Sequence, residues 1–252
     1  GIGFCSTKVK YIYKLYSDIS IFTAEPEIAN DATLFFNMIS GYSAIQTMQQ
    51  IKIAPINLKS SLISLIEREI QNSSPEKPGL IIAKMNSLAH PEIIQALYKA
   101  SCNNVKIKLN IRGICMLVPG VKGMSENIKV VSIVDRYLEH SRIFYFQNGS
   151  DSEIYLASAD WMPRNLERRV ELMFPILDKK VFKEVKSILD VYFEDNCNAH
   201  ELKKDGEWIP VLLEEGQSKR RSQELLYKKY KRRNDSYEKV KQKKFEVRKK
   251  IE

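Results

Sequence analysis

The chain has 252 residues, of which 44% are hydrophobic, and a formal net charge of +9. This length and composition suffice for one large or two small domains with a buried core, so a disordered polypeptide is excluded. Four cysteines without CxxC spacing argue against a disulfide framework or a thiolate zinc site. No apolar run approaches the roughly 18 residues of a membrane span. We expect a soluble cytoplasmic protein, with peripheral contact at the inner membrane surface as a further option.

The positive charge is concentrated at the carboxyl end. Residues 216–252 hold 15 Lys or Arg and 5 Asp or Glu, so the other 215 residues hold 25 basic and 26 acidic groups. The body is therefore nearly neutral, and residues 201–252 are expected to form a basic tail, either helical or disordered. Such a tail attracts phosphates within a Debye length of about 8 Å. A solvated tail without a ligand is the alternative interpretation.

The chain opens with a small segment before the main pattern begins. Residues 18–22 resemble a strand, and Pro26 is well placed to begin a helix that Gly41 would end. This piece is too small to bury a core alone. We expect residues 1–47 to be the remnant of a preceding lobe.

From residue 48 the pattern alternates between strands and helices, which predicts an α/β lobe over residues 48–200. Strands are expected over 51–56, 80–85 and 105–111, with helices between them, and this order favours parallel pairing. Four further strands are predicted over 129–134, 142–146, 154–157 and 170–176, followed by a helix over 181–193. The expected architecture is a mixed, largely parallel central sheet flanked by helices.

Polar residues cluster at the ends of these strands. Arg112 follows the strand that ends at residue 111, His140 precedes the strand that contains Arg142, and Asp160 follows the strand that ends near residue 157. Ligands of α/β folds bind beyond strand ends, so we expect these groups in one crevice. A histidine two residues from a guanidinium suits phosphoryl transfer. Taken singly, Arg112 also fits a surface ion pair, and His140 a structural role.

Longer motifs resemble a known family. His140-x-Arg142 is similar to the His-x-Lys motif of the phospholipase D superfamily, and residues 157–160 lie where that superfamily has Gly-Ser-x-Asn. Glu171 lies near the position of the acidic group that orients the superfamily histidine. More specifically, about residues 14–200 resemble the carboxy-terminal part of bacterial polyphosphate kinase. The segments that carry this resemblance are 15–18, 83–88, 111–115, 125–128, 132–140 and 158–165.

The resemblance implies a phospholipase D-like lobe and reversible transfer of the terminal phosphate of ATP to inorganic polyphosphate, with Mg²⁺. It further implies a phosphohistidine in an earlier lobe, which we expect this chain to lack. His140 would be the second, catalytic histidine, with Asp160 or Glu171 supporting it by accepting a hydrogen bond from its ring. No protein ligand to the metal is assigned. The implied nucleotide and phosphate ligands are Tyr16, Arg112, His140 and Arg142.

Three functions fit these features. The chain is either the carboxy-terminal catalytic portion of a polyphosphate kinase, inactive without the missing lobe, or a phosphodiesterase in which two copies each supply His140, or a degenerate polyanion-binding module. The match outside the His-x-Arg motif favours the first. The expected partners are ATP or ADP, inorganic polyphosphate, the missing lobes and a further copy in a homo-oligomer, without specific nucleic acid.

Overall fold

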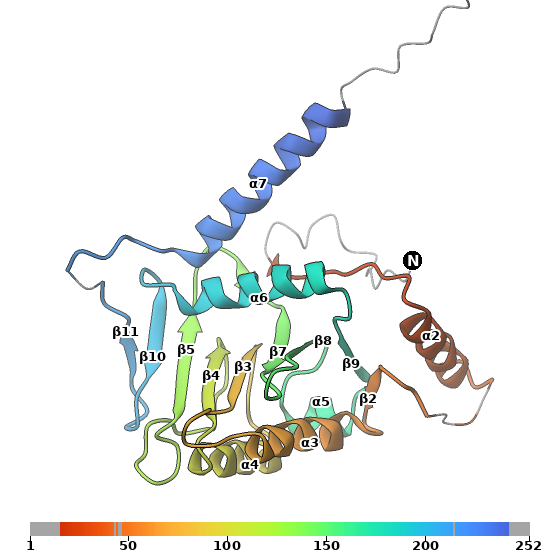
Figure 1. The fold of residues 1–252 in the computed structure, drawn as a ribbon, viewed down its shortest axis with the longest axis horizontal. Helices are drawn as coiled ribbons and strands as arrows, with labels where there is room; N and C mark the ends of the chain where they lie inside the picture. Colours follow the sequence, from red (N-terminus) through yellow and green to blue (C-terminus); the bar gives the residue numbers. More distant parts are fainter. Residues whose placement is uncertain (1–15, 43, 45–46, 214, 242–252) are drawn as a thin grey trace, which may run out of the picture.

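The computed structural model describes residues 16–42, 44, 47–213 and 215–241. A nine-stranded mixed sheet forms its centre, in the order β11-β10-β5-β4-β3-β7-β8-β9-β2. Figure 1 shows the sheet between α6 on one side and α3 with α4 on the other. The strands are β2 (Lys52–Ala54), β3 (Leu80–Met85), β4 (Lys106–Ile111), β5 (Ile128–Ile133), β7 (Arg142–Phe146), β8 (Glu153–Ala157), β9 (Glu171–Pro175), β10 (Ala199–Leu202) and β11 (Trp208–Pro210).

The α/β class and the mixed sheet are confirmed, and parallel pairing is confined to the centre of the sheet. β3 pairs in parallel with β4, and β4 with β5, whereas the other neighbouring strands run antiparallel. The expected parallel pairing of the segment at 51–56 is wrong, because β2 lies at the edge and pairs antiparallel with β9. The chain reaches β3 only after α3 (Leu58–Gln71) has crossed β9, β8 and β7.

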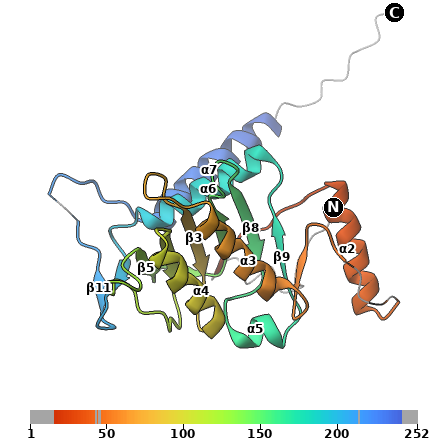
Figure 2. The same ribbon diagram turned by 60° about the horizontal axis from the view of Figure 1, so that its bottom comes forward.

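Helices cover both faces of the sheet because successive side chains along each strand point to opposite faces. On β3, Ile81 and Ala83 pack into the cluster that includes α3 and α4 (Pro91–Cys102). Ile82 points to the other face and packs with Val185 and Leu189 of α6 (Lys179–Phe193). Figure 2 shows α3 and α4 together in front of the sheet. Apolar side chains on both faces explain why β3 is hydrophobic at every position except Lys84.

The opening segment lies beside the main sheet. β1 (Tyr16–Ser17) pairs in parallel with β6 (Leu138–Glu139). The strand expected over 18–22 is wrong, since these residues adopt no regular structure. α2 (Pro26–Ile39) begins at the expected proline, and Gly41 follows it with a φ of 79°, which a glycine adopts without steric cost.

The carboxyl end adds two strands and a helix. The expected boundary at residue 200 falls inside β10, and the sheet continues to β11, while the division into three parts stays a prediction. α7 (Ser222–Lys241) projects from the body beyond α6 (Figure 1). Its first turns pack Leu226 and Tyr230 against Ile188 and Tyr192 of α6. Of the helices in the described ranges, none combines the length and apolar character needed to cross a bilayer.

Candidate active site

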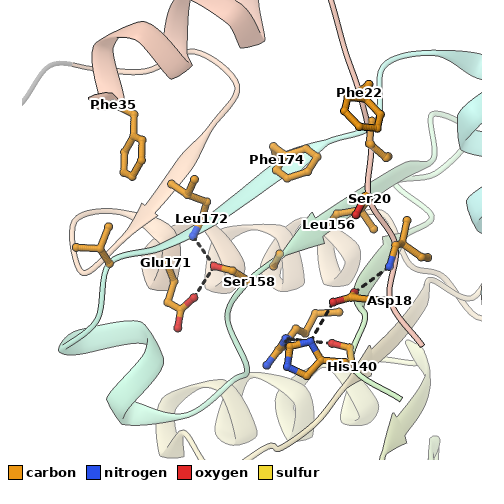
Figure 3. A pocket seen from close by; sticks show the side chains of 15 residues that line it. Asp18, Ser20, Phe22, Phe35, His140, Leu156, Ser158, Glu171, Leu172 and Phe174 are labelled. Carbon is orange, nitrogen blue, oxygen red and sulfur yellow. Dashed lines mark hydrogen bonds and ion pairs between the residues drawn. The ribbon is translucent and has the colours of Figure 1, made fainter. Parts of the chain in front are cut away.

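His140 lies between β6 and β7, beside the opening segment that contains β1. Its backbone N–H donates to the carbonyl of Ser17 at 2.9 Å, which continues the pairing between β1 and β6. Its ring Nδ1 lies 3.0 Å from Asp18 Oδ2 (Figure 3). The side chains of His140 and Asp18 are 38% and 52% exposed. The histidine is therefore accessible and held by a segment distant in sequence.

Asp18 determines which nitrogen of the ring faces a ligand. Partial burial disfavours its charged form, but hydrogen bonds from His140 and from the Ile19 amide outweigh this effect and lower the pKa of the Asp18 carboxyl. An ionised carboxylate can only accept, so His140 donates through Nδ1. The other nitrogen, Nε2, is not engaged by a carboxylate and lies 3.4 Å from Arg142 Nη1.

The expected support of His140 by Asp160 or Glu171 is corrected by these contacts. Asp160 accepts instead from Arg142, with Nε to Oδ1 and Nη2 to Oδ2 both 3.2 Å, and from the Asn86 backbone at 2.7 Å. Glu171 accepts from Asn165 Nδ2 at 2.8 Å and from the Ser158 hydroxyl. Both acids are thus engaged away from the imidazole. The acidic partner, Asp18, lies in a segment that the resemblance marked, but no local pattern links it to His140.

Arg142 supplies a fixed charge beside the imidazole. Its bidentate pair with Asp160 is shielded from water, with side chains 12% and 10% exposed. Its Nη1 donates to the His140 carbonyl at 3.0 Å and lies 3.3 Å from Nδ1 of that ring. Planar bidentate pairing removes most of the freedom of a guanidinium, so the charge stays in one place.

Glu171 shares a cavity with these groups. A cavity of about 540 Å³ is lined by His140, Arg142, Ser158 and Glu171. Apolar side chains form its opposite part, among them Phe22 and Phe174, and Figure 3 shows them across from the polar cluster. Mostly apolar walls with a few convergent polar groups are typical of a ligand site.

Arg112 lines a neighbouring cavity. Its Nε donates to Asn86 Oδ1 at 2.8 Å and to the carbonyl of Glu139, and burial lowers the pKa of this guanidinium. Among the described residues its two Nη nitrogens have no hydrogen-bond partner, which leaves them for a ligand. This cavity, of about 500 Å³, is also lined by Tyr16. The ring of Tyr16 contacts the His140 ring edge-on at 5.4 Å.

The single crevice that we expected for Arg112 and His140 is therefore two adjoining cavities. Tyr16 stands between them, since its ring touches His140 and borders the cavity of Arg112. Gly113 helps to hold Arg112 in place, because its N–H donates to the Asn86 carbonyl at 2.8 Å. A Cβ at position 113 would lie 2.8 Å from that oxygen, so only glycine allows this approach.

The site offers no preformed metal cage. In the described part of the chain, one group of three imidazole or carboxylate ligands lies close enough to hold an ion, formed by His90, Glu92 and Glu167. Lys59 Nζ already binds both glutamates, at 2.8 and 3.2 Å. An ammonium group there opposes a second cation. Since Asp18, Asp160 and Glu171 are engaged as described above, these residues do not fit a resident Mg²⁺ ion.

Comparison with known proteins supports one family. The model of "Polyphosphate kinase C-terminal domain 2" matches residues 51–223. The polyphosphate kinase of Rhodopirellula baltica is 48% identical over 213 residues, which cover 84% of this chain and 25% of that protein. The polyphosphate kinase of Synechocystis sp. is 47% identical over 208 residues, covering 81% and 29%.

A solved structure agrees with the sequence comparison. The crystal structure of polyphosphate kinase from Porphyromonas gingivalis matches with a TM-score of 0.84 and 36% identity, over 88% of this chain and 34% of that one. The chain spans between a quarter and about a third of the length of these proteins. With the family model matching most of its length and the fold in agreement, this chain belongs to the polyphosphate kinase family, and its residues 51–223 correspond to C-terminal domain 2.

Proposed function

We propose that this chain forms one wall of an ATP:polyphosphate phosphotransferase site, and that a second lobe carrying the phosphorylated histidine forms the other. The proposal depends chiefly on one observation. The His140 ring is held between Asp18 and Arg142, with Nδ1 facing Asp18 and Nε2 lying 3.4 Å from Arg142 Nη1. The family resemblance assigns the reaction, which transfers the terminal phosphate of ATP reversibly to polyphosphate.

The two arginines suit a phosphoryl group in transfer. Such a group spreads negative charge over three oxygens, so fixed cations stabilise its transition state. Arg142 is already oriented by Asp160, so its guanidinium needs little reorganisation when the transition state forms. Arg112 has two Nη nitrogens in a fork that matches two phosphate oxygens. Tyr16, between them, would contact the nucleotide.

His140 would act as an acid or base. In the proposed step, a proton on Nε2 is donated to the oxygen that leaves the phosphorus, and it returns in the reverse direction. Asp18 keeps Nδ1 as the donor and stabilises the ring when both nitrogens carry protons. Glu171 and Asp160 would support the site by holding Ser158, Asn165 and Arg142.

Mg²⁺ enters this proposal with the substrate. The ion is usually held by one or two carboxylates together with phosphate oxygens and water. Since the carboxylates near His140 are engaged, MgATP would bring its own ion into the site. Association into homo-oligomers and a cytoplasmic location are parts of the proposal that follow from the resemblance alone.

A hybrid enzyme tests the proposal. The matching segment of the Rhodopirellula baltica polyphosphate kinase is replaced by this chain. Formation of polyphosphate from MgATP and the reverse formation of ATP from polyphosphate are both measured. We expect activity in the hybrid and its loss in the His140→Ala variant. A folded hybrid that is inactive, or a His140→Ala variant as active as its parent, contradicts the proposal.

The isolated chain separates the remaining alternatives. It is incubated with radiolabelled ATP and, separately, with bis(p-nitrophenyl) phosphate. We expect no stable label, because the phosphorylated histidine lies elsewhere, and no release of nitrophenol. Nitrophenol release that disappears in His140→Ala supports the phosphodiesterase instead. Stable labelling of this chain contradicts the assignment of its histidine.

A further inference from the structure

The side chain of Glu139 lies at a buried junction of four segments. It is 2% exposed, and its Oε2 accepts from Ser17 Oγ at 2.7 Å and pairs with Lys84 Nζ at 3.2 Å. Its Oε1 accepts from Gln223 Nε2 at 2.7 Å. The partners come from β1, β3 and α7, while Glu139 itself is on β6. Buried charge becomes tolerable only when such partners satisfy it.

The backbone of the same residue reaches both parts of the candidate site. The carbonyl of Glu139 accepts from Arg112 Nε, and the next residue in the chain is His140. The N–H of His140 donates to the carbonyl of Ser17, whose hydroxyl binds the Glu139 carboxylate. A displacement of β6 would therefore move His140 and the anchor of Arg112 together.

Gln223 attaches this junction to the basic helix α7. It is buried, and its amide nitrogen donates to the carbonyl of Tyr137 at 2.7 Å as well as to Glu139. Its amide oxygen accepts from the N–H of Tyr137 at 2.9 Å. One side chain thus satisfies both backbone groups of the residue before β6 and one oxygen of Glu139. A glutamine used in this way is a bridge between elements, beyond what helix packing requires.

We infer that Gln223 is a positioning residue, which holds β6 through Tyr137 and Glu139 and thereby sets the places of His140 and Arg112. The helix that carries the positive charge of the carboxyl end is then a mechanical part of the site. The catalytic consequence rests on the proposed function, whereas the positional consequence rests on the contacts alone.

Variants can break this bridge and leave α7 attached. Gln223→Met keeps the length of the side chain and removes its hydrogen bonds. The neighbouring Ser222 still binds Asp195, with its N–H and hydroxyl both at 2.7 Å, and Arg221 still pairs with Asp135. Gln223→Glu is a second variant, which keeps an acceptor for Tyr137 but places a carboxylate against that of Glu139.

Leu226→Ala is the matched control. Leu226 lies on α7 one turn after Gln223, and it packs against the cluster around Tyr192 of α6 without a hydrogen bond to β6. The control loosens the packing of α7 on α6, so a general effect of a weaker helix appears in it as well. Only the positional effect is specific to Gln223.

Amide hydrogen exchange of the 252-residue chain is the first measurement, and it requires no activity. We expect Gln223→Met to speed exchange at Tyr137 and His140 about tenfold or more, and Gln223→Glu to do so at His140, while Leu226→Ala leaves the His140 amide near its parent rate. Unchanged exchange at His140 in whichever Gln223 variant folds overturns the inference, and so does equal acceleration by Leu226→Ala.

The second measurement uses the hybrid enzyme. We expect both Gln223 variants to lower kcat about tenfold, since small misplacements of reacting groups are costly, with Leu226→Ala within about twofold of the parent. Faster exchange with an unchanged kcat overturns the catalytic part of the inference and leaves the proposed function standing. An inactive parent hybrid contradicts the proposed function only, because the exchange measurement still decides the positional claim.

Discussion

Asp18 and His140 are 122 positions apart in the chain, yet Asp18 Oδ2 and His140 Nδ1 lie 3.0 Å apart. The register of β1 and β6 explains this contact. Ser17 lies opposite Glu139 in a parallel pair, so the residues that follow them leave the pair side by side. The same pairing places Tyr16 against the imidazole. A two-residue strand thus assembles the tyrosine, the acid and the histidine.

The pairing of Asp18 predicts a specific response of stability to pH. The pKa of its carboxyl is lowered from 3.8 in the folded protein. A group with a depressed folded pKa contributes stability above its unfolded pKa, and the contribution is lost as pH falls through the folded value. We expect Asp18→Asn to lower stability at pH 7, by an amount that shrinks as the pH falls below the unfolded pKa of the carboxyl. Urea unfolding across this range measures it.

Asp151→Asn provides the comparison, since Asp151 is an exposed turn residue. Its unfolding midpoint at pH 7 should match that of the parent. A difference between Asp18→Asn and the parent that stays constant as the pH is lowered to the acid limit of the folded state contradicts the assigned ion pair.

Replacement of His140 by asparagine should remove proton transfer and retain the fold. We expect the hybrid enzyme with His140→Asn to lose about 10²- to 10⁴-fold in kcat, the usual scale for a general acid or base. His200→Asn serves as control, because His200 lies on β10 and, among the described residues, its ring makes only a 3.3 Å contact to the Asn198 carbonyl. Steady-state kinetics distinguish the two, and similar losses in both variants exclude the proposed role.

Arg112 tests the need for a forked cation. Arg112→Lys keeps the positive charge but loses the two Nη groups and the Nε contacts to Asn86 and Glu139. We expect turnover to fall about 100-fold in Arg112→Ala, the scale for one transition-state donor, and the lysine variant to recover little of it. Turnover within about threefold of the parent in the alanine variant rules out the assignment.

Lys84 and Glu139 predict a strong, coupled effect on stability. Both side chains are 2% exposed and paired at 3.2 Å, and burial lowers the pKa of Lys84 despite that partner. Lys84→Met leaves the carboxylate unpaired, so we expect a loss of about 3–5 kcal/mol in the free energy of unfolding. Glu139→Gln in the same chain should restore much of it. Urea titration of the single and double variants checks this, and additive losses contradict the coupling.

Local pattern predicted the long and well-buried elements. The strands at Leu80–Met85 and Arg142–Phe146 have the expected bounds. Both lie inside the sheet and bury side chains on its two faces, so most of their residues are apolar and the run is visible in the sequence. The start of α2 at Pro26 was predictable from the conformational restriction of proline. By contrast, β6 and α5 (Pro163–Glu167) were missed, since short elements carry too few residues for a period to emerge.

The sequence by itself determined the α/β class, the family, and the candidate residues that belong to motifs, because these depend on local spacing and residue type. Tertiary structure alone decided which acid serves His140, that Arg112 and His140 border separate cavities, and that β2 lies at an edge. Tertiary structure alone also brought Gln223 to Glu139 of β6, which lies 84 positions earlier in the chain. The physical reason is that such contacts depend on strand register and crossover path, which nonlocal packing selects and no short window of sequence records.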